Sequence, residues 1–225
     1  MKPMLFNGEM VMAILDGRKT QTRRIVKGIG DIPTPYGVEL SPEDDGSFQM
    51  FDFLYGYIDG TNCVDCFRTV RAPYKPGDVL YVRETWKNAT GDTAGGGYGL
   101  FDTYIYKADG KAKDNYPIEQ LMVENRWRPS IHMPKEAARI FLRVTNVSTE
   151  RLQEIRAEDC VSEGAVRKPN ITKRGDLVIH GRYRKEFAAL WDSTVQYPYR
   201  PKYGWDANPW VWVIEFERCY PQNST

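Results

Sequence analysis

The stretch Trp210-Val211-Trp212-Val213-Ile214-Glu215-Phe216 is the most apolar run of the chain and lies near its carboxyl terminus. Aromatic and β-branched residues dominate it, and Asn208-Pro209 directly before it is a turn signal. Short apolar runs that begin at turn residues are typical of strands buried on both faces. We therefore expect 210–216 to be a central strand of the core.

The rest of the chain predicts further strands and several helices. Val79-Leu80-Tyr81-Val82-Arg83-Glu84-Thr85-Trp86 follows the turn Lys75-Pro76-Gly77-Asp78 and predicts a second strand. Similar runs predict strands over 102–107 and 139–145. Four helices are expected. The first starts at an Asn7 cap and ends at Asp16-Gly17, the second starts at a Ser148 or Thr149 cap, and the third runs through Cys160 to Gly164. The fourth carries a stripe of Tyr183, Phe187, Leu190 and Trp191.

Long polar stretches separate these elements. Segments 28–75 and 88–126 are rich in Gly, Pro and polar residues, and we interpret them as insertions, the first with one hairpin and suited to cover a cleft. Two polar loops, 91–99 and 165–181, are also expected. Strands interrupted by insertions, with few helices, predict one α+β domain over 1–225, built on a small mixed β-barrel with flanking helices.

The composition excludes several classes of protein. The chain has 225 residues, with 31 Lys and Arg against 30 Asp and Glu, so a net charge of +1 gives no global attraction to a polyanion. Four cysteines do not form a disulfide scaffold, and the amino terminus resembles neither a signal peptide nor a membrane span, which predicts a cytoplasmic protein. Cys63-Val64-Asp65-Cys66 has no matching second pair, so we expect no zinc and no other cofactor.

The polar octet Gly17-Arg18-Lys19-Thr20-Gln21-Thr22-Arg23-Arg24 begins where the first helix ends. One interpretation is a solvated turn. The other is a catalytic segment, because a neutral lysine amine removes a proton from a threonine hydroxyl, and burial or nearby arginines favour the neutral amine. Lys19 and Thr22 point to opposite faces of a regular strand, so their cooperation requires a loop or a bulge.

Glu84 is the second candidate for chemistry. Strand alternation places it on one face with Leu80 and Val82, so an interior position would desolvate its carboxylate and demand a cation or donor nearby. It is either a catalytic acid or the partner of a structural ion pair.

These residues carry a family resemblance. Gly17-Arg18-Lys19 resembles the Gly-x-Lys signature of the ASCH domain family, and Pro76-Gly77-Asp78 with the strand ending in Glu84 resembles its second motif. The segments 127–134 and 208–213 and the strand from Ile140 are similar to a longer, phage- and prophage-encoded branch of that family. The insertion 28–70 lies outside the resemblance.

The resemblance implies a PUA-like barrel and a cleft for a modified base or nucleoside. One small bacterial branch of the family hydrolyses the acetyl amide of N4-acetylcytidine with a lysine, a threonine and a glutamate, and Lys19, Thr22 and Glu84 match those positions. By that analogy Lys19 activates Thr22, and Glu84 holds the charge of the site or passes a proton to the leaving amine. Other members of the family are RNA-binding or ribonucleolytic, so the alternative is a non-catalytic reader of RNA or DNA. A role in protein interactions during virus growth is a third possibility, with no residue that argues for it.

Further residues are candidates for contact with a nucleoside or RNA. Each also has a structural alternative: solvated arginines at strand ends, tryptophans in the core, and a histidine satisfied by its neighbours. The sequence does not predict an oligomeric state. The candidates are Thr20, Arg23, Arg24, Arg83, Trp86, Trp127, Arg128 and His132.

Overall fold

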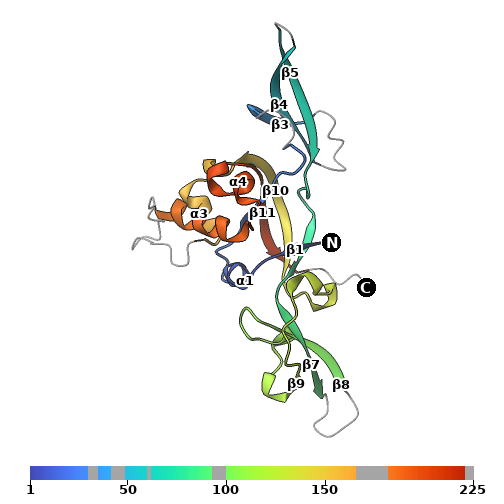
Figure 1. Ribbon diagram of the computed structural model, residues 1–225. Coiled ribbons are helices and arrows are strands. Elements are labelled where there is room, and N and C mark those ends of the chain that lie inside the picture. Colours follow the sequence, from blue (N-terminus) through green and yellow to red (C-terminus); the bar gives the residue numbers. More distant parts are fainter. Residues whose placement is uncertain (30–34, 42–48, 60–61, 93–99, 166–181, 221–225) are drawn as a thin grey trace, which may run out of the picture. The chain divides into compact units, whose positions relative to one another are not determined.

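The computed structural model describes residues 1–29, 35–41, 49–59, 62–92, 100–165 and 182–220 (Figure 1). The chain divides into two compact units made of interleaved segments. The first unit comprises Met1–Lys19, Asp78–Arg143 and Glu217–Thr225, and the second comprises Thr20–Gly77 and Val144–Phe216. A single domain over 1–225 stays a prediction. Most of the predicted loops 91–99 and 165–181 lies outside the described residues.

Five strands are hydrogen-bonded in the order β1-β6-β10-β11-β2. β11 lies between β10 and β2, which confirms the predicted interior position of the apolar run. The parallel β1–β6 pair contrasts with the antiparallel β6–β10 and β2–β11 pairs. The bounds are β1 Lys2–Leu5, β2 Gln21–Ile25, β6 Val79–Arg83, β10 Phe141–Arg151 and β11 Trp210–Cys219.

The first unit adds a helix and a second sheet. Helix α1 (Gly8–Leu15) starts at Asn7, whose side chain accepts a hydrogen bond from the backbone N–H of Met10, as predicted. The predicted strand over 79–86 is wrong at its end, because Trp86 starts a new strand. In its sheet of order β8-β7-β9 the strands are β7 Trp86–Asp92, β8 Leu100–Tyr106 and β9 Leu121–Val123. Short 3-10 turns occupy Lys113–Asn115, Ile118–Gln120, Ser130–His132 and Lys135–Ala137.

In its described residues, the second unit holds the predicted hairpin of the first insertion and three helices. The hairpin is the pair β4 and β5 in a sheet of order β3-β4-β5. The helix expected after Ser148 or Thr149 is wrong: β10 continues to Arg151, and only a 3-10 turn follows. Strand pairing overrides the local cap signal there. The elements are β3 Gly37–Leu40, β4 Met50–Asp59, β5 Asn62–Arg71, α2 Ala157–Ser162, α3 Arg182–Thr194, α4 Arg200–Tyr203 and 3-10 turns Leu152–Glu154 and Trp205–Ala207.

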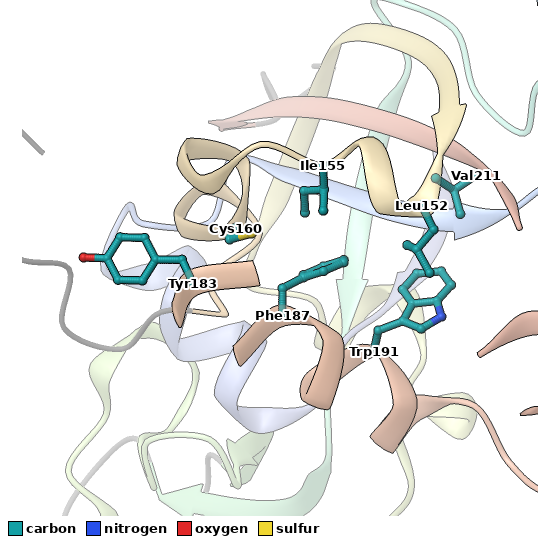
Figure 2. Packing of buried hydrophobic residues seen from close by; sticks show 7 residues of the cluster. All are labelled: Leu152, Ile155, Cys160, Tyr183, Phe187, Trp191 and Val211. Carbon is teal, nitrogen blue, oxygen red and sulfur yellow. The ribbon is translucent and has the colours of Figure 1, made fainter. Parts of the chain in front are cut away.

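The core of the second unit is built on the predicted stripe of α3 (Figure 2). Tyr183, Phe187 and Trp191 follow one another at four-residue intervals and are all buried, whereas Leu190 is half-buried. Phe187 packs 6.2 Å from the Trp191 ring and 6.0 Å from the Trp205 ring, measured between centroids. Residues from the 3-10 turn after β10, from α2 and from β11 complete the cluster: Leu152, Ile155, Cys160 and Val211.

The mixed α+β class is confirmed. Across the described ranges the strands form three sheets, and none of these sheets closes into a barrel. Within the same ranges, no helix has the length and apolarity needed to cross a bilayer.

Candidate functional site

Lys19 ends the first segment of the first unit and is buried. Gly17 has a φ of +74°, and the backbone N–H groups of Arg18 and Lys19 both donate to the carbonyl of Ala13, which closes α1. The Lys19 side chain is only 3% exposed, and its Nζ lies 5.4 Å from the centroid of the Phe6 ring. The solvated-turn interpretation therefore fails for Lys19.

Thr20 and Thr22 open the second unit and differ in environment. Thr20 is exposed, its N–H donates to Ser162 O, and its carbonyl accepts from Phe216 N. Thr22 is 3% exposed and lies opposite Ile214 in the β2–β11 ladder. β2 begins at Gln21, so Lys19 lies outside the regular strand. The predicted proton transfer between Lys19 and Thr22 requires this, because the two side chains would point to opposite faces of a regular strand.

Glu84 lies directly after β6, and its carboxylate forms a two-point ion pair with Arg139. Arg139 Nε donates to Oε1 at 2.9 Å, and Arg139 Nη2 donates to Oε2 at 2.9 Å. Arg139 Nη1 also donates to Asp109 at 2.8 Å, and its guanidinium lies 3.9 Å from the centroid of the Tyr106 ring. Tyr106 in turn donates to the carbonyl of Ala137 at 2.7 Å. Glu84 therefore lies in the interior, and the cation that an interior position demands is Arg139.

The two carboxylates of this cluster respond differently to burial. Glu84 is 1% exposed, and burial raises its pKa above the ordinary range although Arg139 acts to lower it. Burial also acts to raise the pKa of Asp109, but hydrogen bonds from Arg139 and from the Lys111 N–H outweigh it and lower the pKa. Glu84 is therefore the carboxyl of the pair that takes up a proton more readily.

Arg23 is enclosed by carboxylates of the second unit. It is 3% exposed, and its Nε donates to Glu150 at 2.7 Å, while Nη1 donates to Glu163 at 3.2 Å and Nη2 lies 3.5 Å from Asp159. These pairs join β2 to β10 and to the α2 region, and they compensate the charge of Arg23. The neighbouring residue Arg24 is exposed instead.

Trp86 and Arg128 meet in the first unit. Trp86 is 4% exposed and belongs to a buried cluster. It therefore packs in the core, which was the structural alternative to contact with a nucleoside or RNA. The two residues exchange backbone hydrogen bonds of 3.2 and 2.7 Å, and the Arg128 guanidinium lies 5.3 Å from the Trp86 ring. Arg128 also forms an ion pair with Glu124 at 2.9 Å.

Trp127, Arg83 and His132 lie near the same segment at more open positions. Trp127 is half-buried, with Lys87 Nζ 4.5 Å from its ring. Arg83 Nη1 donates to the carbonyl of Ile131 at 3.1 Å, next to His132, which is exposed. Arg83 therefore contacts the segment 127–134 at Ile131, and a binding role for Arg83, Trp127 and His132 stays a prediction.

A pocket of about 560 Å³ in the second unit brings together residues that the sequence interpretation missed. It lies where β2 meets the ends of α3 and α4. The stretch 197–203, in which tyrosines alternate with basic residues and prolines, was the available signal, because aromatic and basic residues recur in nucleotide-binding surfaces. The lining residues are Arg23, Arg24, Ile25, Lys27, Trp191, Thr194, Val195, Gln196, Tyr199 and Tyr203.

Across the part of the chain that the structure describes, no cluster of three or more His, Cys, Asp or Glu side chains has a geometry that could hold a metal ion. No protein-family model, no curated protein and no solved structure matches the chain.

Proposed function

We propose that the chain is a hydrolase that removes the acyl group from an acylated nucleobase or nucleoside of the N4-acylcytidine type. The observation that supports it is the burial of the three residues that this chemistry needs. Lys19 and Thr22 are each 3% exposed and Glu84 is 1% exposed. Lysine and glutamate are almost never buried to this degree without a specific partner or task.

The reaction assigns one role to each residue. The Thr22 hydroxyl attacks the carbonyl carbon of the acyl amide and gives its proton to the neutral Lys19 amine. The C–N bond then breaks, the acyl group stays on Thr22 as an ester, and the leaving amino group receives a proton from Glu84. Water, deprotonated by a carboxylate or amine of the site, hydrolyses the ester and restores Thr22. The raised pKa of Glu84 suits a proton donor.

The ion pair with Arg139 has a defined part in this scheme. Two hydrogen bonds fix the orientation of the Glu84 carboxyl group, yet each oxygen keeps a lone pair for a proton. Membership of the ASCH family, a PUA-like fold and a cytoplasmic location belong to the same proposal.

The test is hydrolysis of N4-acetylcytidine, followed by chromatography of the released cytidine. We expect Lys19→Met and Thr22→Val to abolish turnover, whereas Thr22→Ser keeps a hydroxyl and retains part of it. Thr103→Val is the matched control, because Thr103 is also a buried strand threonine, at 6% exposure, and has no role in the reaction. Turnover that survives Thr22→Val in a folded protein refutes the assignment of the nucleophile.

RNA binding without turnover is the second candidate, and the half-buried Trp127 beneath Lys87 favours it. Fluorescence anisotropy with short single-stranded RNA tests it. We expect binding that weakens with salt and with Trp127→Leu, and no loss in the buried variant Thr103→Val. An unchanged affinity in Trp127→Leu contradicts the role of that ring.

A further inference from the structure

The pocket between β2, α3 and α4 of the second unit has the chemistry of an anion site with aromatic walls. None of Lys19, Thr22 and Glu84 lines it, so it is not part of the proposed reaction. Its volume of about 560 Å³ falls in the range of roughly 300–1,000 Å³ that is usual for small-molecule sites.

The cations of the pocket come from β2 and from the residues directly after it. Arg24 and Lys27 line it from exposed positions, whereas Arg23 contributes a buried wall. Within the described chain, the carboxylates that hold Arg23 do not line the pocket, and neither does any other Asp or Glu. The lining therefore favours an anion, and an arginine with a neighbouring lysine is a common phosphate-binding pair.

Aromatic rings reach the pocket from the opposite elements. Trp191 is held in place by a hydrogen bond of 2.8 Å from its Nε1 to the carbonyl of Tyr203. The rings of Tyr199 and Tyr203 lie 6.5 Å apart with an interplanar angle of 33°. Tyr199 is 60% exposed, so its ring face is accessible to a ligand. Exposed aromatic faces bind planar heterocycles by stacking.

We propose that this pocket binds a nucleoside monophosphate, with the phosphate on Arg24 and Lys27 and the base against Tyr199. Gln196 and Thr194 line the same space and supply an amide and a hydroxyl for the edge of the base or the sugar. A phosphate with no base leaves the tyrosines unused, and a nucleoside with no phosphate leaves the two cations unused. Both parts of the ligand are therefore required for tight binding.

Isothermal titration calorimetry of the full chain at low salt tests the proposal with three probes: the four common nucleoside monophosphates, the corresponding nucleosides, and inorganic phosphate. At least one monophosphate is expected to bind about tenfold or more tighter than its nucleoside, through charge-assisted hydrogen bonds. It is also expected to bind tighter than inorganic phosphate. Arg24→Ala and Lys27→Ala should each weaken the monophosphate severalfold and leave the nucleoside unchanged, while Tyr199→Ala should weaken both.

Two matched controls keep the result specific. Lys185→Ala removes an exposed lysine of α3 that does not line the pocket, and Tyr197→Ala removes a tyrosine that is 87% exposed, two residues before Tyr199. Neither should change the affinity, and thermal melting confirms that the variants fold. The proposal is overturned by the absence of saturable monophosphate binding, by equal affinity for nucleoside and monophosphate, or by equal losses in the controls and the pocket variants. Acetylcytidine hydrolysis is unaffected by any of these results, so the two proposals fail separately.

Discussion

Replacing Arg139 by methionine tests the charge cluster around Glu84. The substitution removes both hydrogen bonds to the Glu84 carboxylate, the bond of 2.8 Å to Asp109, and the stacking on Tyr106. Glu84 is 1% exposed, so water does not replace the lost donors without rearrangement. The variant therefore leaves a buried carboxylate without its cation.

The expected loss of stability is large. Breaking a buried ion pair by removing one partner costs about 3–5 kcal/mol. The guanidinium–ring contact with Tyr106 adds about 0.5–1 kcal/mol. We expect urea denaturation at pH 8 to show a loss of about 3.5–6 kcal/mol in the free energy of unfolding, with part of it recovered in the double variant Arg139→Met with Glu84→Gln, because that variant has no buried charge.

The pH dependence of the stability loss in Arg139→Met shows which carboxylate causes it. The folded-state pKa of Glu84 is raised, so between the unfolded and folded pKa values the folded state binds more protons, and stability falls as the pH rises. Removing Arg139 raises the folded-state pKa of Glu84 further, so the range over which stability falls with pH extends to higher pH. The lowered pKa of Asp109 gives stability that is present throughout pH 5 to 8. The loss in Arg139→Met should therefore be smaller at pH 5 than at pH 8.

Arg128→Met is the matched control. Arg128 also makes a two-point contact with a carboxylate, that of Glu124, but the two side chains are 43% and 41% exposed. Solvent screens such pairs, so the midpoint of unfolding should stay close to that of the unchanged protein. Equal losses in Arg139→Met and Arg128→Met, or a loss in Arg139→Met that does not vary between pH 5 and pH 8, would refute the reasoning.

Three further predictions concern the second unit. Arg23→Met leaves the enclosing carboxylates without their cation and should cost about 3–5 kcal/mol in urea denaturation; a loss below about 1 kcal/mol contradicts the buried pairing. Phe187→Ala opens a cavity beside two tryptophan rings and should cost about 3–5 kcal/mol by the same measurement, whereas a smaller loss would mean that the core collapses around it. Burial raises the pKa of Cys160 to about 12, so iodoacetamide at pH 8 should label it only after unfolding, while labelling of Cys160 in the folded protein, detected by peptide mass spectrometry, argues against that environment.

The sequence was most informative where a few neighbouring residues determine the structure. The Asn7 cap, the turn of positive φ at Gly17 and the buried stripe of α3 each depend on contacts within one or two helical turns. Such patterns are visible without knowledge of the fold. Local signals failed at Ser148 and Thr149, where strand pairing extended β10 through the expected start of a helix.

In the candidate site, too, the sequence predicted local features, whereas contacts between distant residues came from the fold. The sequence alone determined that Gly17–Arg24 follows a helix end, that Glu84 lies beside a buried strand, and that 210–216 is interior. Only the tertiary structure gave Glu84 its cation, 55 residues away, and Arg23 its carboxylates, 127 and 140 residues away. The physical reason is the range of the forces: caps and stripes act between neighbours in sequence, whereas the partner of a buried charge is whichever group the folded chain places within about 3 Å of it.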